Sequence, residues 1–132
     1  IAMLSFSNFG SAKGEEPTKV AKATKILKEQ YPDLKVEGEM QANVALNPSL
    51  RNELYPFNDL DEEQINTLVF PNLASGNIAY KLLMEMGSAE AIGPILMGMK
   101  KPVHVLQIGS SVREIMNMVA IAVVDAQNQE TK

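Results

Sequence analysis

The sequence contains no cysteine and only one histidine, His104. The absence of cysteine excludes disulfides, zinc–thiolate sites and cysteine nucleophiles, and a lone histidine excludes any metal site that needs several. Arginine is scarce too, because Arg51 and Arg113 are the only ones, and the net charge is −4. A surface that follows nucleic-acid phosphates is therefore not expected, although a local cationic patch for one small anion stays open.

Long apolar runs are missing as well. None reaches the roughly 18 to 20 residues that a membrane span requires, and the N-terminal stretch has neither the basic flank nor the cleavage site of a signal peptide. We therefore expect a cytoplasmic protein. The 132 residues, 45% of them hydrophobic, suffice for one compact domain. Because the chain opens at Ile1 in an apolar run typical of a buried strand, we expect it to be a piece of something longer.

The first part of the chain combines short apolar runs with one helical pattern. The run at 1–6 is typical of a strand that leaves into a polar loop, which continues to Gly14. Pro17 opens a helix and Pro32 stops it. Residues 34–40 alternate as a half-buried strand does. The apolar positions at helical spacing are Val20, Ala23, Leu27 and Tyr31.

The middle of the chain predicts two helices and a strand. A short helix is expected over 44–54, with Pro48 near its start, followed by an acidic surface connection over 59–63. Residues 67–70 predict a second buried strand. Helical spacing then returns over 77–86.

The C-terminal part is the most apolar. Two further apolar segments, 91–98 and 103–106, precede a final helix within 111–127. Ser111 is the predicted N-cap of this helix, and Glu114, three residues on, completes a capping box. Because the helix is apolar on nearly all sides, it is either fully buried or shared with a second subunit.

Strands that alternate with helices predict an α/β fold: a three-layer α/β/α sandwich with a mainly parallel sheet, since parallel neighbours need helical crossovers. We treat residues 1–132 as a single fragment of such a domain. In open α/β sheets, ligands bind where strands deliver their carboxyl ends into loops. Three such loops here carry polar residues.

The first loop, 5–11, follows the N-terminal strand. Its composition can surround a phosphate or a carboxylate with backbone N–H groups. It matches neither a Walker loop nor a dinucleotide fingerprint, so a plain turn is the alternative. Its candidate ligand-binding residues are Ser5, Ser7, Asn8, Gly10 and Ser11.

The second loop leads into the helix over 77–86. Ser75 and Asn77 lie at the head of this helix, whose positive end favours an anion. Lys81, one turn later, can neutralise a phosphate. Ordinary helix capping and a solvated surface lysine are the competing explanations.

The third loop holds Gln107 and Ser111 together with His104. A histidine titrates near neutrality and can act as acid or base, but no nucleophile or orienting carboxylate is adjacent, which favours a structural histidine bonded to a backbone group. Separately, Glu37 and Glu39 share one face of a predicted strand and suit cation binding or paired acid–base work. A charged strand end in solvent is the favoured alternative. No catalytic or metal residue is assigned.

Several runs stand out along the chain: LSFSNFGS at 4–11, VEGEMQA at 36–42, VFPNLASGNIAYK at 69–81, PVHVL at 102–106 and NMVAIAVVDAQ at 117–127. Together they resemble the phosphate acetyltransferase family. They keep the family's order and span nearly the whole chain, but they correspond only to the C-terminal portion of its catalytic domain. The resemblance implies a phosphotransacetylase-like fold, of the isocitrate and isopropylmalate dehydrogenase type.

Two branches of that family differ after Pro102. The resemblance implies that true phosphotransacetylases place Ser-Arg just before the glycine here and an aspartate further on; the arginine holds phosphate, and the aspartate is proposed to deprotonate the thiol of coenzyme A. This chain has Gln107, Ile108 and Glu114 at those positions. An isoleucine offers no donor in place of a guanidinium fork, so we expect no acetyl transfer.

The runs at 7–11 and 102–106 look like the other branch, the C-terminal domain of large bacterial malic enzymes. That resemblance implies a parent that oxidises and decarboxylates malate to pyruvate with NADP and a divalent metal, Mg²⁺ or Mn²⁺, bound in a separate N-terminal part and not by this chain. The resemblance also implies that the domain is linked to oligomerisation and to sensing acetyl-CoA.

The implied partners are therefore acetyl-CoA or a related acyl-CoA, the N-terminal malic enzyme and NADP-binding domains, and a second subunit docked on the helix at 111–127. A working phosphate acetyltransferase and a dimerisation scaffold with an empty pocket are the alternatives. An effector regulates only if it binds two global states unequally.

Overall fold

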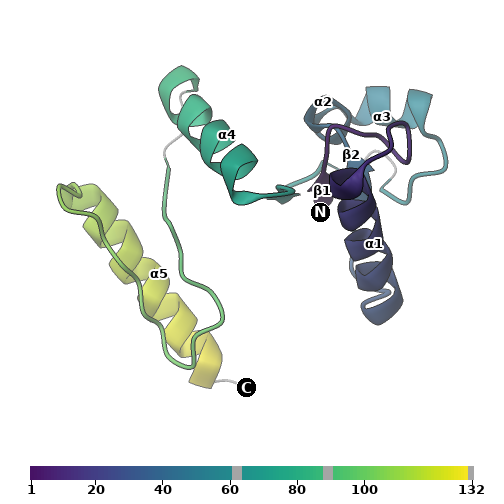
Figure 1. The fold of residues 1–132 in the computed structure, drawn as a ribbon. Coiled ribbons are helices and arrows are strands. Elements are labelled where there is room, and N and C mark those ends of the chain that lie inside the picture. Colours follow the sequence, from purple (N-terminus) through teal and green to yellow (C-terminus); the bar gives the residue numbers. More distant parts are fainter. Residues whose placement is uncertain (61–63, 88–90, 131–132) are drawn as a thin grey trace. The chain divides into compact units, whose positions relative to one another are not determined.

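The computed structural model describes residues 1–60, 64–87 and 91–130. The chain divides into two compact units, Ile1–Lys81 and Leu82–Lys132 (Figure 1). Part of the predicted acidic connection at 59–63 lies outside the described residues.

The first unit is built around a three-stranded parallel sheet in the order β2-β1-β3. Parallel neighbours need crossovers, and α1 makes the crossover between β1 and β2. The helix α4 starts in this unit and ends in the second. The elements are β1 (Ala2–Leu4), α1 (Glu15–Gln30), β2 (Glu37–Met40), α2 (Ala42–Leu46), α3 (Pro48–Leu54), β3 (Leu68–Val69) and α4 (Leu73–Met86).

Helices cover both faces of this sheet, because successive strand residues point to opposite sides. Ala2 and Leu4 pack in one cluster with Val44 of α2. Met3, between them, packs in a second cluster with Val20 of α1. The α/β class, the parallel sheet and the layered arrangement predicted from the sequence are therefore confirmed.

The strands β1 and β2 approach each other closely at Gly38. A Cβ atom there would lie 2.5 Å from the backbone O of Met3 and 2.8 Å from its Cβ. The φ angle of Gly38 is +144°, a backbone conformation that residues other than glycine rarely adopt. Glycine is thus required in the run at 36–42 by packing.

The helix α1 follows the predicted pattern with two differences. It begins at Glu15, with Pro17 inside its first turn, and ends at Gln30. Tyr31, expected on the apolar stripe, lies at the C-cap and is 57% exposed. Thr24 is buried instead, because its hydroxyl donates to the Val20 carbonyl at 3.0 Å and so needs no water.

Two predictions for the middle of the chain are corrected. The single helix over 44–54 is two helices, α2 and α3, since Asn47 caps α3 by accepting the Leu50 N–H at 3.0 Å and Pro48 starts it. The strand predicted as buried over 67–70 is only β3, in which Leu68 is half-buried and Val69 is exposed. This strand lies at the edge of the described sheet, where one side has no neighbour.

The second unit contains the end of α4 and the helix α5 (Val112–Glu130). The apolar segments at 91–98 and 103–106 form neither helix nor strand. The alternative that the last helix is fully buried is not met, because Val119 and Val123 are about half exposed while Met118 is buried. No helix in the described ranges is both long and apolar enough to cross a membrane.

Candidate functional site

The backbone N–H groups of the loop after β1 form hydrogen bonds within the chain. Every N–H from residue 7 to residue 12 donates within the chain, so in this conformation none is directed at an outside anion. The pairs are Ser7 to Ser5 Oγ (3.3 Å), Asn8 to Ser11 Oγ (2.8 Å), Phe9 to Glu39 O (2.8 Å), Gly10 to Glu39 Oε1 (2.6 Å), Ser11 to Asn8 O (3.0 Å) and Ala12 to Ser7 Oγ (3.0 Å).

Glu39 of β2 is the centre of this network. Its Oε1 accepts the Gly10 N–H at 2.6 Å and the Ser7 hydroxyl at 2.8 Å. Glu39 is 3% exposed and Glu37 is 4% exposed. The favoured prediction that both glutamates extend into solvent is therefore wrong: burial is offset by hydrogen bonds that the sequence pattern does not reveal.

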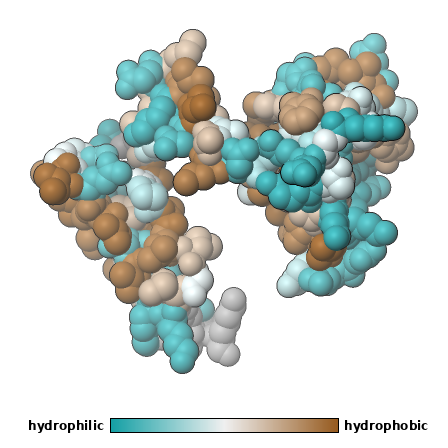
Figure 2. Space-filling model, viewed as in Figure 1, coloured by the Kyte–Doolittle hydropathy of each residue, from teal (hydrophilic) through white to brown (hydrophobic). Residues whose placement is uncertain are grey.

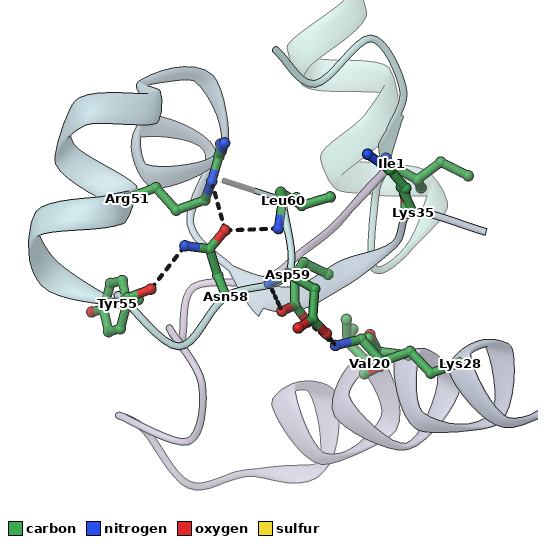
Figure 3. Close-up of polar contacts among 11 residues, drawn as sticks. Ile1, Val20, Lys28, Lys35, Arg51, Tyr55, Asn58, Asp59 and Leu60 are labelled. Carbon is green, nitrogen blue, oxygen red and sulfur yellow. Dashed lines mark hydrogen bonds and ion pairs between the residues drawn. The ribbon is translucent and has the colours of Figure 1, made fainter. Parts of the chain in front are cut away.

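The two glutamates also serve different partners. Glu37 Oε1 lies 2.6 Å from Lys28 Nζ, and its Oε2 accepts the Asp59 N–H at 3.0 Å. Lys28 Nζ also lies 2.7 Å from Asp59 Oδ2 (Figure 3). Burial alone lowers the pKa of Lys28, but its bonds to Asp59 and Glu37 more than compensate, so the pKa is raised above 10.5.

Polar contacts join the carboxyl ends of the strands. After β2, the Gln41 N–H donates to Asn8 Oδ1 and its Nε2 to the Phe6 carbonyl, both at 2.7 Å. The first turns of α1, which directly follow the loop, reach the connection after β3: Lys19 Nζ donates to the Pro71 carbonyl at 2.7 Å. The first two predicted loops therefore lie at the carboxyl ends of the strands, and α1 connects them through the contact between Lys19 and Pro71.

The helix α4 begins earlier than predicted. Its cap is Asn72, whose Oδ1 accepts the Ser75 N–H at 2.9 Å and whose Nδ2 donates to Glu16 Oε1 at 2.9 Å. Ser75 is therefore in the first turn and returns its hydroxyl to the Asn72 carbonyl at 3.0 Å. An asparagine just after Pro71 is an N-cap signal that the sequence analysis overlooked.

The two remaining candidates on α4 face outward. Asn77 and Lys81 are both exposed, and Asn77 lies within the helix and not at its head. Lys81 Nζ lies 5.0 Å from the centroid of the Tyr80 ring, a cation–π contact. Both side chains are available to a ligand.

The third loop lies in the second unit. Gln107 is exposed and Ile108 is fully exposed, with a relative accessibility of 108%. The predicted capping box is confirmed: Glu114 Oε2 accepts the Ser111 N–H at 2.6 Å, and Ser111 Oγ accepts the Glu114 N–H at 3.2 Å. The backbone hydrogen bond from Ser111 lowers the pKa of Glu114 below 4.5. The helix N-terminus is thus already satisfied by a carboxylate of the chain.

His104 differs from its expected structural role. Both ring nitrogens are buried, and neither has a hydrogen-bond partner among the described residues. The prediction of a histidine bonded to a backbone group is therefore wrong. Its ring lines an apolar pocket of about 420 Å³ together with Ile95, Met97, Ala120, Ile121, Val124, Asp125 and Asn128.

The geometry of the candidates falls into two groups. Ser5, Ser7, Asn8, Gly10 and Ser11 form one hydrogen-bonded loop in the first unit, which also holds Ser75, Asn77 and Lys81. Gln107 and Ser111 belong to the second unit. In the described ranges, no group of three or more acidic or histidine side chains is placed to hold a metal ion.

Comparison with known proteins assigns this arrangement to a family. The profile of the phosphate acetyl/butaryl transferase family matches residues 1–123. The chain is 44% identical over 129 residues to the NADP-dependent malic enzyme of Haemophilus influenzae, covering 98% of this chain and 17% of that protein. It is 46% identical over 127 residues to the phosphate acetyltransferase of Clostridium acetobutylicum, covering 96% of this chain and 38% of that protein.

The fold is shared with solved structures as well. A phosphotransacetylase from Streptococcus pyogenes superposes with a TM-score of 0.89 at 42% identity, covering 96% of this chain and 38% of that one. The chain therefore spans well under half the length of the relatives it matches. In the malic enzymes the matching region is the C-terminal part.

Proposed function

Since this chain belongs to the phosphate acetyl/butaryl transferase family, we propose that it is the acyl-CoA-sensing and assembly part of an NADP-dependent malic enzyme and that it does not transfer acetyl groups itself. In this proposal the oxidative decarboxylation of malate, with NADP and a divalent metal, belongs to the rest of the parent protein. Acetyl-CoA or a related acyl-CoA is the effector.

The observation that carries the proposal is the exposed side chain of Ile108. A phosphoryl group that reacts with an acyl group must be held by cations or strong donors, and guanidinium forks suit it best. At the turn before α5, this chain presents an isoleucine with 108% relative accessibility and an uncharged Gln107. The adjacent helix N-terminus is occupied by the Glu114 carboxylate, which repels a phosphate.

The loop after β1 supports the same conclusion. Its N–H groups serve the chain itself, and the Glu39 carboxylate within it disfavours a second anion at that point. Exposed cations that can meet the phosphates of coenzyme A include Lys81 on α4 and Lys13 just beyond the loop. Exposed lysines recognise a phosphate as point charges, which fits binding without catalysis.

The assembly half of the proposal rests on apolar surface. No residue of α4 is buried, and Leu73, Leu83 and Met86 are more than 60% exposed. On α5, Met116 and Val112 are equally open. Figure 2 shows hydrophobic residues gathered along both helices. Contiguous apolar surface of this kind marks protein interfaces.

A phosphate acetyltransferase is the competing function, favoured by the 46% identity to a protein of that name. The malic enzyme relatives match equally well, so identity does not separate the two. Ile108 supports the malic enzyme proposal, because its apolar side chain bears on the binding of phosphate and not on that of coenzyme A.

The test is calorimetric titration of acetyl-CoA into the full-length protein, with malate oxidation and acetyl transfer to phosphate assayed in parallel. We expect saturable binding, altered malate turnover and no acetyl transfer. Lys81→Ala should weaken binding, while Lys25→Ala, which removes an exposed lysine of α1 that pairs with Glu29, should not. Absence of binding overturns the sensing role, and acetyl transfer establishes the competing function.

Assembly is tested separately by light scattering of Val119→Glu, which places a charge on the exposed apolar side of α5. We expect the molar mass to fall relative to the unchanged protein. An unchanged mass contradicts the use of α5 as an interface.

A further inference from the structure

We propose that Glu39 is the positioning residue of the loop after β1, and that its buried carboxylate occupies an anion-binding nest which the loop forms around it. The loop therefore carries its own anion. This goes beyond the proposed function, and it depends on that function only for its consequence for acyl-CoA binding.

Three contacts make Glu39 the anchor. The Gly10 N–H and the Ser7 hydroxyl converge on one oxygen, Oε1, at 2.6 and 2.8 Å, and the Phe9 N–H donates to the backbone carbonyl of Glu39 at 2.8 Å. Hydrogen bonds to an ionised acceptor are among the strongest in proteins. Ser7 is fully buried, so no water replaces its contact with Glu39.

The backbone around the loop tip is arranged for this acceptor. Gly10 has φ +86°, a conformation that turns its N–H toward Glu39 and that glycine adopts readily. Phe9 has φ +47°, which is uncommon for a residue with a side chain. Its ring packs against Tyr55 and Phe57, with centroids 4.9 and 5.1 Å away, and these contacts hold the uncommon backbone in place.

The network extends from the nest to the rest of the loop. The same Ser7 oxygen that donates to Glu39 accepts the Ala12 N–H at 3.0 Å, so the carboxylate orients the hydroxyl for its second bond. Removing the carboxylate deprives the Gly10 N–H of its acceptor, and it leaves the buried Ser7 hydroxyl with longer contacts, to the Ala12 carbonyl at 3.4 Å and to Ser11 Oγ at 3.5 Å. Formate supplies a small carboxylate of the same charge, so it is the probe for the position that the Glu39 side chain vacates.

The experiment is chemical rescue read by amide exchange. In Glu39→Ala, NMR-detected hydrogen exchange of Gly10 and Ala12 should accelerate at least about tenfold, the loss expected when a charge-assisted bond of ordinary strength is removed. Sodium formate should restore protection in a saturable way and raise the thermal midpoint, because it binds only the folded variant. The unchanged protein should show no formate effect beyond that of equal sodium chloride.

Two further variants keep the test decisive if Glu39→Ala folds poorly. Glu39→Gln retains an oxygen acceptor and leaves no void, so it should keep part of the Gly10 protection and ignore formate. Glu39→Asp, shorter by one methylene, should lose Gly10 protection while the Phe9 N–H, bonded to the backbone carbonyl of residue 39, stays protected. Unchanged Gly10 exchange in Glu39→Asp, or equal formate effects in the alanine and glutamine variants, overturns the proposal.

The effect of Glu39 on acetyl-CoA binding is measured separately from amide exchange. If Glu39 positions the loop for an acyl-CoA, formate should also restore acetyl-CoA affinity to Glu39→Ala. Exchange rescue without acetyl-CoA binding in any form, including the unchanged protein, leaves the nest established and overturns the proposed sensing function alone.

Discussion

Ser111 and Glu114 exchange hydrogen bonds across the first turn of α5, with the Ser111 N–H 2.6 Å from Glu114 Oε2 and the Glu114 N–H 3.2 Å from Ser111 Oγ. Each group thereby satisfies a donor that the helix start leaves open. In this pair, two residue types three positions apart in the sequence are enough to specify the local structure.

The capping box predicts a pH dependence of α5. The pKa of Glu114 is lowered from 4.5 by the hydrogen bond from the Ser111 backbone. A lowered folded-state pKa stabilises the helix start above the unfolded value, and this stabilisation is lost as the pH falls through the folded pKa. The ¹³Cα shifts of residues 112–116 should therefore lose helical character below pH 4.5. Glu114→Gln should remove the transition, whereas Glu29→Gln, on exposed α1 surface, should retain it.

The Lys28 cluster predicts unequal roles for its two carboxylates. Glu37 is buried and Asp59 is largely exposed, with side-chain accessibilities of 6% and 74%. Glu37→Gln should lower the free energy of unfolding by about 1–3 kcal/mol, because Glu37 is buried and its charge-assisted bond to Lys28, whose side chain is 36% exposed, is lost. Asp59→Asn should lower it by about 0–1 kcal/mol. Urea denaturation measures both, and equal losses would contradict the burial argument.

The raised pKa of Lys28 adds a second condition to the same cluster. A group whose folded pKa is raised contributes stability that is present below its unfolded value and is lost as the pH rises through the folded pKa. The difference between Glu37→Gln and the unchanged protein should therefore shrink only above pH 10.5. Denaturation at neutral and at alkaline pH compares the two, and a difference that already shrinks near neutrality speaks against Lys28 as the partner.

Gly38→Ala should be strongly destabilising. The added Cβ would lie 2.5 Å from the Met3 carbonyl, so the backbones of β1 and β2 would have to separate. We expect a loss of at least about 2–3 kcal/mol in the free energy of unfolding. Gly98→Ala is a suitable control, since it also has positive φ but nothing lies within 4 Å of its Cβ. Similar losses for the two variants would show that φ alone, and not the contact with Met3, sets the requirement.

Asn58→Ala should loosen the segment after α3. Asn58 Oδ1 accepts from Arg51 Nε at 3.3 Å and from the Leu60 N–H at 3.1 Å, while its Nδ2 donates to the Tyr55 carbonyl at 2.8 Å (Figure 3). Arg51 is fully buried, so losing an acceptor is costly. We expect a loss of about 2–4 kcal/mol by urea denaturation. Asn66→Ala, an exposed asparagine bonded to its neighbour Thr67, should change stability by less than about 0.5 kcal/mol.

The spacing of residues in the sequence was enough to predict those features that depend on residues close together in the chain. The capping box of Ser111 and Glu114, the helix around Pro17 and the buried strand at Ala2–Leu4 were all predictable, because each depends on residues a few positions apart. The family resemblance carried by runs such as the one at 36–42 was likewise present in the sequence and is confirmed. The contacts that the residues of those runs make could not be predicted from the sequence.

Only the tertiary structure decided which polar residues are inside. Glu39 reads as a solvent-facing strand end by alternation, and it is buried because Ser7 and Gly10, about thirty positions earlier in the chain, supply its donors. Glu37 is buried for the same kind of reason, since Lys28 comes from another element. Burying a charge is favourable only when its hydrogen-bond partners are already in place. The packing of β1, α1 and β2 brings those partners to the glutamates, and the residues adjacent in the sequence do not determine them.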